Sequence, residues 1–228
     1  YVVHTAVHAE SNPTGTLSSM VYMAYNQRSL FVTGVWTTVQ LALAGTAIAF
    51  VLALLMVFLR IQEPDKRNND FVKIIKIVAN KFARFYIFVI RGTPMMVQSL
   101  IFYYAIFNLF KRTGMSVTEI NRVWSLFISG LVTVSLNSTA YLAEVLRGGI
   151  LAVDAGQMEA ARSLGMTHWQ AMRRVVFPQA IKNSLPAIGN EFIINIKDSS
   201  VLCVLGVSDL MFMTRSVAGI YYKGTECY

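Results

Sequence analysis

Between Arg28 and Arg60 the chain carries no ionisable side chain, and this run is long enough to cross the hydrocarbon core of a bilayer as a helix. Two further runs without charge extend from Gly92 to Leu109 and from Val123 to Ala143. The chain is 55% hydrophobic and only 14% charged, which is unlike an ordinary soluble domain. Because a backbone in hydrocarbon must satisfy its own hydrogen bonds, these runs predict an all-α, polytopic membrane protein.

The hydrophobic runs and their flanking residues predict where the spans lie. We expect four spans, over residues 29–59, 94–110, 123–142 and 184–205. The stretch 207–222 is short for a span, so the last helix is expected to be truncated. Residues 71–90 contain basic side chains that can reach the headgroups, and they predict an interfacial helix leading into the membrane. Residues 1–28 are expected to form an extracytoplasmic lead-in or the end of a linker, ahead of a transmembrane domain over 29–228.

The basic residues indicate which loops lie in the cytoplasm. The segment from Arg60 to Arg91 contains eight Lys and Arg, and residues 147–182 contain five, whereas only Arg28 precedes the first span. Cytoplasmic loops carry such an excess of positive charge, so both segments are expected inside and the N-terminus outside. Because the net charge of +8 is concentrated in alternate loops, it indicates membrane topology rather than binding of nucleic acid.

The second basic segment contains two short helices, and the first has its own start and stop signals. Asp154 is an N-cap candidate with Gln157 three residues later, and Gly165 can adopt the left-handed conformation that ends a helix. At 100° per residue, one narrow apolar side of this helix consists of small or aliphatic residues, namely Ala160, Ala161 and Leu164. Small side chains permit a partner to approach closely.

The second short helix repeats the arrangement. Thr167 and Gln170 form another capping pattern, and Pro178 has no amide hydrogen, so this helix is expected to end near Phe177. Its apolar face consists of Trp169, Met172, Val175 and Val176. The pair indicates a docking surface rather than a catalytic one, and an ordinary cytoplasmic helical hairpin is the alternative interpretation.

Polar side chains interrupt the third and fourth predicted spans. Asn137, Tyr141 and Glu144 are spaced to share one helix face, and Lys197 and Asp198 lie within the fourth span. Such groups either join helices by hydrogen bonds or line a substrate path, and the sequence leaves both interpretations open. Around Lys197 and Asp198 we expect an unwound helix, whose two charges neutralise each other or line a wet cavity.

The sequence lacks the patterns that catalysis, metal binding or ATP binding require. Cys203 and Cys227 are too few for a zinc site or a disulfide framework. His4 and His8 are four residues apart, but the residues between them, Thr-Ala-Val, do not form the H-E-x-x-H pattern of a zinc site. No phosphate-binding GxxxxGK[ST] motif occurs, so any ATP with its Mg²⁺ must be bound by another chain. We therefore expect a non-catalytic chain with no metal site and no cofactor of its own.

The docking surface carries a resemblance to a known family. Glu159, Ala160 and Ala161, then Gly165, then Val175-x-Phe177-Pro178 resemble the cytoplasmic loop of importer-type ABC transporter permeases, whose pattern is Glu-Ala-Ala, Gly and Ile-x-Leu-Pro at the same spacing. Val for Ile and Phe for Leu are departures that keep the apolar character. Five motifs resemble the branch for polar amino acids such as histidine, arginine, glutamine and glutamate. They are Arg91-Gly92-Thr93-Pro94, Ala140-Tyr141-x-x-Glu144-x-x-Arg147-Gly148-Gly149-Ile150, Gly156-Gln157-x-Glu159-Ala160-Ala161, Pro178-Gln179-Ala180 and Lys197-Asp198-Ser199-Ser200.

The resemblance implies a fold and a set of partners. The fold would be the five-helix transmembrane domain of type I ABC importers, in a bacterial plasma membrane. Two permease chains, identical or homologous, would pair above two ATPase subunits that bind ATP and Mg²⁺. An extracytoplasmic amino acid binding protein, or a binding domain fused before Tyr1, would deliver the substrate.

The resemblance also implies roles for the residues singled out above. Glu159, Ala160, Ala161 and Gly165 would contact the ATPase, and alternating access would follow ATP hydrolysis. For the substrate path we expect Asn137, Tyr141, Glu144, Lys197 and Asp198, because a zwitterion needs opposite charges from different spans. The alternative from another class is an ATP-independent secondary transporter or channel for a small polar solute. The sequence does not select the amino acid that is carried.

Overall fold

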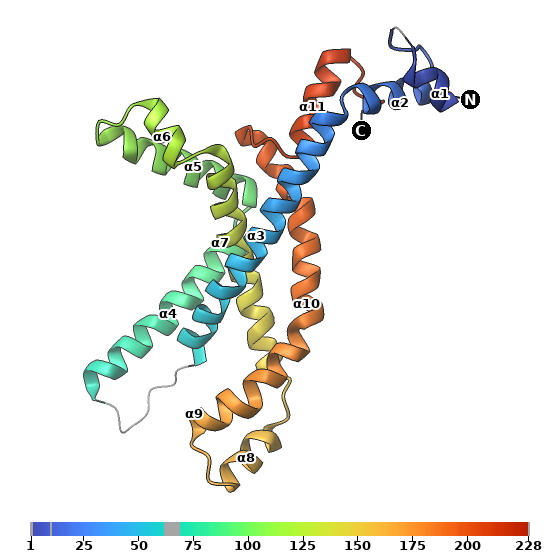
Figure 1. The fold of residues 1–228 in the computed structure, drawn as a ribbon. Coiled ribbons are helices and arrows are strands. Elements are labelled where there is room, and N and C mark those ends of the chain that lie inside the picture. The colour runs from blue at the N-terminus through green and yellow to red at the C-terminus, as the bar shows by residue number, and fades with distance from the viewer. Residues whose placement is uncertain (1, 10, 62–68, 228) are drawn as a thin grey trace. The chain divides into compact units, whose positions relative to one another are not determined.

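The computed structural model describes residues 2–9, 11–61 and 69–227, and within them every regular element is a helix. This confirms the all-α prediction. Figure 1 shows the helices in chain order. They are α1 (Val2–Val7), α2 (Thr16–Asn26), α3 (Arg28–Ile61), α4 (Asp70–Gly92), α5 (Met95–Arg112), α6 (Val117–Val123), α7 (Leu126–Leu151), α8 (Ala155–Ser163), α9 (His168–Ala171), the π-helix η1 (Met172–Val176), α10 (Phe177–Asp198), the 3₁₀ helix η2 (Ser199–Leu205) and α11 (Leu210–Tyr221).

The apolar helices correspond to the predicted spans. Over the described ranges, α3 and α7 are long and apolar enough to cross a membrane alone. Two bent pairs of helices, α4 with α5 and the helices over 168–205 with α11, also reach that limit if each pair is one span. The helix predicted over 71–90 is α4. The span predicted over 94–110 is α5, which reaches the limit only together with α4.

The chain divides into two units, which we describe separately. The terminal unit consists of Tyr1–Ala42, Ser99–Leu131 and Ile196–Tyr228. The central unit consists of Leu43–Gln98 and Val132–Asn195. Because the units are assembled from separate stretches of sequence, α3, α5, α7 and α10 each contribute residues to both.

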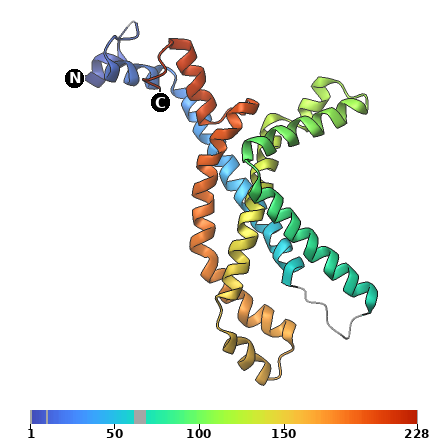
Figure 2. The same ribbon diagram turned by 180° about the vertical axis from the view of Figure 1, so that it is seen from behind.

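In the terminal unit, the N-terminal helices pack against the C-terminal segment. The rings of Tyr22 and Tyr221 meet edge to face, with centroids 6.2 Å apart. Lys223 Nζ donates hydrogen bonds to Ser19 Oγ at 2.9 Å and to the carbonyl oxygen of Pro13 at 3.0 Å. These contacts hold α2 and the turn before it against the C-terminal segment. Figures 1 and 2 show the labelled N and C ends beside α2 in this unit.

The same unit places α11 close to the backbone of α3. Asp209 caps α11 by accepting a hydrogen bond from the Phe212 amide at 2.8 Å. Thr38 Oγ1 accepts one from the Leu210 amide at 3.2 Å. A Cβ added at Gly34 would lie 2.9 Å from Leu210 Cα, so only glycine permits this approach.

In the central unit, glycine likewise lets α7 contact its neighbours. A Cβ at Gly45 of α3 would meet Val134 of α7 at 2.6 Å. A Cβ at Gly149 would lie 2.7 Å from the carbonyl oxygen of Ala180 in α10. Figure 2 shows the last turns of α7 and the first turns of α10 side by side, with α8 and α9 beyond them. Close helix contact through small residues is typical of membrane helices.

Candidate functional site

The first helix of the predicted docking surface starts and ends as its sequence indicates. Asp154 Oδ1 accepts a hydrogen bond from the Gly156 amide at 2.7 Å. Gln157 takes no part in the cap, because its Oε1 accepts a bond from Gln179 Nε2 at 3.3 Å. At the other end Gly165 has φ +82°, and the Met166 amide donates to the Ala161 carbonyl at 3.2 Å. This is the hydrogen bonding of a Schellman end, which needs a left-handed residue and therefore favours glycine.

The capping box predicted for the second helix is present. The Gln170 amide donates to Thr167 Oγ1 at 3.2 Å, and the Thr167 amide donates to Gln170 Oε1 at 2.9 Å. Two amides that would lack partners at a helix start are thus satisfied reciprocally. We call residues 154–178, with both capped helices, the docking loop.

The prediction that Pro178 ends the second helix is wrong. From α9 the chain continues through η1, whose π turn is wider than an α turn, directly into α10. Pro178 is the second residue of α10. The wider turn lessens the clash of the proline ring with the preceding carbonyls, and Gln179 Nε2 donates to the carbonyl of Val175 at 2.9 Å. The docking loop is therefore continuous with a helix that forms part of the fourth predicted span.

The residues of the apolar face predicted for α8 are not all exposed to the same degree. Ala161 is buried, and α8 packs against α9 and η1. Glu159 and Ala160 are exposed, and Leu164 is 81% exposed. Trp169 is 56% exposed, although its ring meets that of Phe58 in α3 with centroids 5.7 Å apart. The outer side of the docking loop therefore combines a carboxylate with uncovered apolar surface, which is typical of an interaction site.

Glu144 lies within a cluster of charges that joins two helices of the central unit. Its carboxylate pairs with Arg60 at the end of α3 and with Arg147 one turn further along α7, where Nε to Oε2 is 2.9 Å. Asn80 Nδ2 of α4 donates to the backbone carbonyl of Arg60 at 2.9 Å. Two guanidinium groups already neutralise Glu144, so the cluster holds helix ends together.

Asn137 contacts a glutamine that the sequence analysis did not single out. Gln98 is 5% exposed, and its Nε2 donates to the carbonyls of Ile90 at 2.8 Å and Thr93 at 2.9 Å, beside the break between α4 and α5. Asn137 Nδ2 donates to Gln98 Oε1 at 3.0 Å. Because a helix break frees backbone carbonyls that water cannot reach in a membrane, this pair stabilises the break.

A second buried chain of hydrogen bonds connects three helices. Ser138 Oγ of α7 donates to Asn195 Oδ1 of α10 at 2.8 Å. Asn195 Nδ2 donates to Thr46 Oγ1 of α3, also at 2.8 Å. Thr46 and Asn195 were not predicted as site residues. A polar side chain in an apolar span is a signal for such a role, but the sequence does not show which partner it meets.

Tyr141 differs from its neighbours because it faces open space. Its side chain is 37% exposed, and the guanidinium carbon of Arg91 lies 5.1 Å from the centroid of its ring. Both line a hollow of about 330 Å³ together with Ile87, Phe88 and Gly92. Arg91 was noted as part of a motif but not as a site residue. This hollow lies within the central unit.

Lys197 and Asp198 belong to the terminal unit. They end α10, and the chain then tightens into η2 and turns at Gly206, which has φ +92°. The prediction of an unwound helix around these two residues is wrong, because both are helical in α10 and the chain beyond them tightens into a 3₁₀ helix from Ser199. Over the described ranges no direct ion pair joins Lys197 to Asp198.

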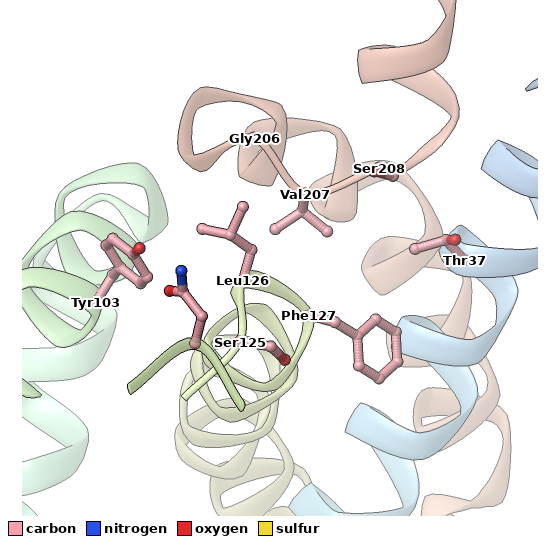
Figure 3. A pocket seen from close by; sticks show the side chains of 9 residues that line it. Thr37, Tyr103, Ser125, Leu126, Phe127, Gly206, Val207 and Ser208 are labelled. Atoms are coloured by element: carbon pink, nitrogen blue, oxygen red, sulfur yellow. The ribbon is translucent and has the colours of Figure 1, made fainter. Parts of the chain in front are cut away.

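A larger hollow in the terminal unit was not predicted. It has a volume of about 480 Å³. Figure 3 shows Tyr103 of α5, Leu126 of α7 and the turn at Gly206 around it. The lining is uncharged, and its members are Thr37, Tyr103, Asn121, Ser125, Leu126, Phe127, Gly206, Val207 and Ser208. Hydroxyl and amide groups there can bind neutral polar atoms.

In the part of the chain that the structure describes, no group of three or more His, Cys, Asp or Glu side chains could hold a metal ion. Of the two hollows described above, one contains Arg91 and Tyr141, and the other contains hydroxyl and amide groups. The arrangement can bind a polar solute and can join helices, and its outward-facing loop can bind a partner.

Comparison with known sequences gives consistent matches. Residues 74–222 match the family described as "Binding-protein-dependent transport system inner membrane component". The glutamine transport system permease protein GlnP of Escherichia coli K12 is 34% identical over 151 residues, which are 66% of this chain and 65% of that protein. A putative glutamine transport system permease protein GlnP of Rickettsia prowazekii is 32% identical over 200 residues, which are 87% of this chain and 82% of its own length.

A solved structure agrees with these matches. It is described as "Crystal structure of an amino acid ABC transporter with histidines", with a TM-score of 0.74 and 38% identity. The similarity covers 95% of this chain and 88% of that chain. The predicted fold class, an all-α membrane domain of this importer type, is thereby confirmed. The match to the Escherichia coli permease spans just under two thirds of that protein, 65% of its length.

Proposed function

This chain belongs to the family of binding-protein-dependent transport system inner membrane components, and on that premise we propose that it is the membrane-spanning permease subunit of an ATP-driven importer of polar amino acids. The docking loop is the observation that carries the proposal. Its two helices are capped by Asp154 and by Thr167 with Gln170, so they can transmit a displacement without fraying. The names of the relatives, which mention glutamine or amino acid transport, support the substrate class.

In this proposal the ATPase binds the outer side of the docking loop. Glu159 supplies charge, Ala160 permits close approach, and Gly165 sets the turn between the helices. Ala161 contributes from inside, because it is buried and fixes the spacing of the helices. Since the loop continues through η1 into α10, a displacement of the loop would move that helix as a rigid body.

We further propose the assembly that such a subunit requires. Two permease chains, identical or homologous, pair in a bacterial plasma membrane with their N-termini outside. Two ATPase subunits bind ATP and Mg²⁺ below them. The segment 29–228 is the transmembrane domain, with residues 147–182 in the cytoplasm, and residues 1–28 are an extracytoplasmic lead-in. The excess of Lys and Arg in alternate loops supports this orientation, and an extracytoplasmic binding protein or fused binding domain would present the amino acid.

The predicted substrate path keeps its residues, but with different duties. Tyr141 faces an open hollow and is the member that can contact substrate directly. Asn137 is already hydrogen-bonded to Gln98, and Glu144 is already paired with two arginines. We therefore assign both residues the role of holding the helices around the path in place. Lys197 and Asp198 stay in the proposal as the charged end of α10. Uptake kinetics of Lys197→Met test that role, and an unchanged rate and affinity would count against it.

A single experiment distinguishes this function from a transporter that works without ATP. The chain is tagged in its native host, purified with whatever ATPase accompanies it, and reconstituted in vesicles. Uptake of labelled L-glutamine is then measured with ATP supplied to the face that bears the docking loop, and separately with an ion gradient. The proposal predicts uptake that needs ATP. Gradient-driven uptake by the purified chain alone would contradict it.

A further inference from the structure

Arg91 is a charge without a carboxylate partner among the residues that the structure describes, where the ion pairs involve Arg60, Lys73 and Arg147. It is one residue from the end of α4 and is exposed. Its guanidinium lies over the ring of Tyr141, with the guanidinium carbon 5.1 Å from the ring centroid. An aromatic face attracts a cation but leaves the N–H groups at the guanidinium edge without acceptors.

Tyr141 places this charge within a membrane span, so Arg91, the last of the eight basic residues in the segment 60–91, lies where that segment enters the membrane. Tyr141 lies in α7, Leu126–Leu151. At a rise of about 1.5 Å per residue, Tyr141 is about 22 Å from the first residue of α7 and about 15 Å from the last. An arginine facing hydrocarbon at such a depth is costly, so arginines there face a wet cavity or a protein surface. Arg91 is therefore expected to face a wet cavity or another protein surface rather than lipid, and the hollow beside it favours the cavity.

The space beside Arg91 suits a small ligand. The hollow has a volume of about 330 Å³, at the small end of the range for ligand pockets, roughly 300 to 1,000 Å³. Its other walls are Ile87, Phe88, Tyr141 and Gly92. A Cβ at Gly92 would meet nothing within 4 Å, so open space adjoins the backbone next to Arg91. Apolar walls lower the local dielectric and strengthen the attraction between a guanidinium and an anion.

We propose that Arg91 binds the α-carboxylate of the transported amino acid, and that Tyr141 positions the guanidinium for it. This inference rests on the proposed function and names the binding group within it. The planar guanidinium can donate two parallel N–H bonds to a carboxylate, while its face stays against the ring. Glu144 does not compete for Arg91, because Arg60 and Arg147 already neutralise it.

The chemistry that recognises a carboxylate also recognises a lipid phosphate, so the experiment must separate the two anions. The purified permease complex is placed in nanodiscs without any binding protein, because a binding protein selects amino acids itself. Equilibrium binding of L-glutamine, L-histidine, L-arginine and L-glutamate is measured. The amino acid that binds most tightly is then compared with its α-amide, which keeps the ammonium group and side chain but lacks the carboxylate.

We expect the wild-type complex to prefer the amino acid to its α-amide by at least about tenfold. Arg91→Gln should weaken binding of the amino acid by about the same factor and leave binding of the α-amide unchanged. Arg91→Lys keeps the charge but not the two parallel N–H donors, so its affinity for the amino acid should lie between those of the wild type and Arg91→Gln. It replaces Arg91→Gln as the test if the glutamine variant does not fold. The matched control is Arg84→Gln, which removes an arginine of α4 outside the hollow and should change nothing.

Tyr141 provides a test of positioning. Tyr141→Phe retains the ring and should keep the preference for the carboxylate, whereas Tyr141→Ala should reduce it severalfold. A preference that survives Arg91→Gln, an equal loss for amino acid and α-amide, or no binding of any of the four amino acids by the wild type would overturn the inference. The equal loss is the result expected for a lipid phosphate. ATP-driven uptake by the wild type is measured in parallel, so the inference can fail while the proposed function stands.

Discussion

The ring of Trp169 meets the ring of Phe58 edge to face, with their centroids 5.7 Å apart and their planes at 75°. Phe58 lies in the last turn of α3, and Trp169 lies in α9 of the docking loop. The same end of α3 is held by Asn80 of α4 and by Glu144 of α7. A displacement of the docking loop can therefore reach three helices of the central unit through this aromatic contact.

The aromatic pair predicts non-additive variants. Trp169→Ala should reduce ATP-driven uptake severalfold, and Phe58→Ala should do the same. Because such a pair is worth about 0.5–1.5 kcal/mol beyond its buried area, the double variant should lose little more than either single one. Uptake and ATP hydrolysis of the four proteins measure this. Phe85→Ala, which removes an aromatic side chain of α4 that is 66% exposed, is the control, and fully additive losses would contradict the coupling.

Gly165 predicts a loss of transport without a loss of insertion. Its φ of +82° costs a β-branched residue about 1–2 kcal/mol, although nothing lies within 4 Å of an added Cβ. Gly165→Val should therefore distort the turn between the two docking helices and abolish uptake, while the amount of chain in the membrane stays normal. Gly165→Asn is the matched control, because asparagine tolerates this conformation and should retain most of the activity. Normal uptake by the valine variant would show that the turn is dispensable.

Two adjacent glycines of α7 should respond oppositely to the same substitution. Gly149→Ala places a methyl group 2.7 Å from the carbonyl oxygen of Ala180, so α7 and α10 must separate. Gly148→Ala meets nothing within 4 Å and gains helix propensity of up to about 1 kcal/mol. The midpoint of thermal unfolding in detergent should fall for the first variant and stay level or rise for the second. Equal midpoints would mean that the close approach of these helices does not contribute to stability.

The charge cluster predicts an order of stabilities. Glu144→Gln leaves two arginines without their anion and should destabilise the chain by about 1–3 kcal/mol, less than for a fully buried pair, because Glu144 is 22% exposed. Arg147→Gln should cost less, because Arg147 is 38% exposed and Glu144 keeps Arg60. Thermal unfolding of both variants measures the order. If Glu144→Gln is as stable as the wild type, the carboxylate does not stabilise the chain through the charge cluster.

Local signals in the sequence were sufficient for the caps of both docking helices and for the end of the first, but not for the end of the second. The caps at Asp154 and Thr167 and the left-handed Gly165 involve neighbours within a few residues, so their chemistry can be identified without a structure. The spans α3 and α7 follow from the absence of charge. The helix end predicted at Pro178 was wrong because the π turn η1 accommodates the proline and lets the helix continue. The continuation, α10, packs against α7, and the local sequence does not show that contact.

Partners distant in sequence could not be predicted. Asn137 and Glu144 were selected because they share a face with Tyr141, but their contacts are Gln98 and Arg60, which lie on other helices. A face defined by periodicity shows which side chains point together, not which of them stay open to a solute. The exposed member, Tyr141, is distinguished only by the hollow that it shares with Arg91.

The central claim is that the docking loop binds a separate ATPase that drives transport, and Leu164 tests it most directly. Its side chain is 81% exposed, so Leu164→Glu should not disturb folding but should add a charge to the proposed contact. Leu17→Glu, at a leucine of α2 that is 64% exposed, is the control. With tagged complexes in vesicles, we predict that Leu164→Glu loses both the copurifying ATPase and ATP-driven uptake of labelled L-glutamine, whereas Leu17→Glu keeps both. An undiminished ATPase and normal uptake in Leu164→Glu would contradict the account.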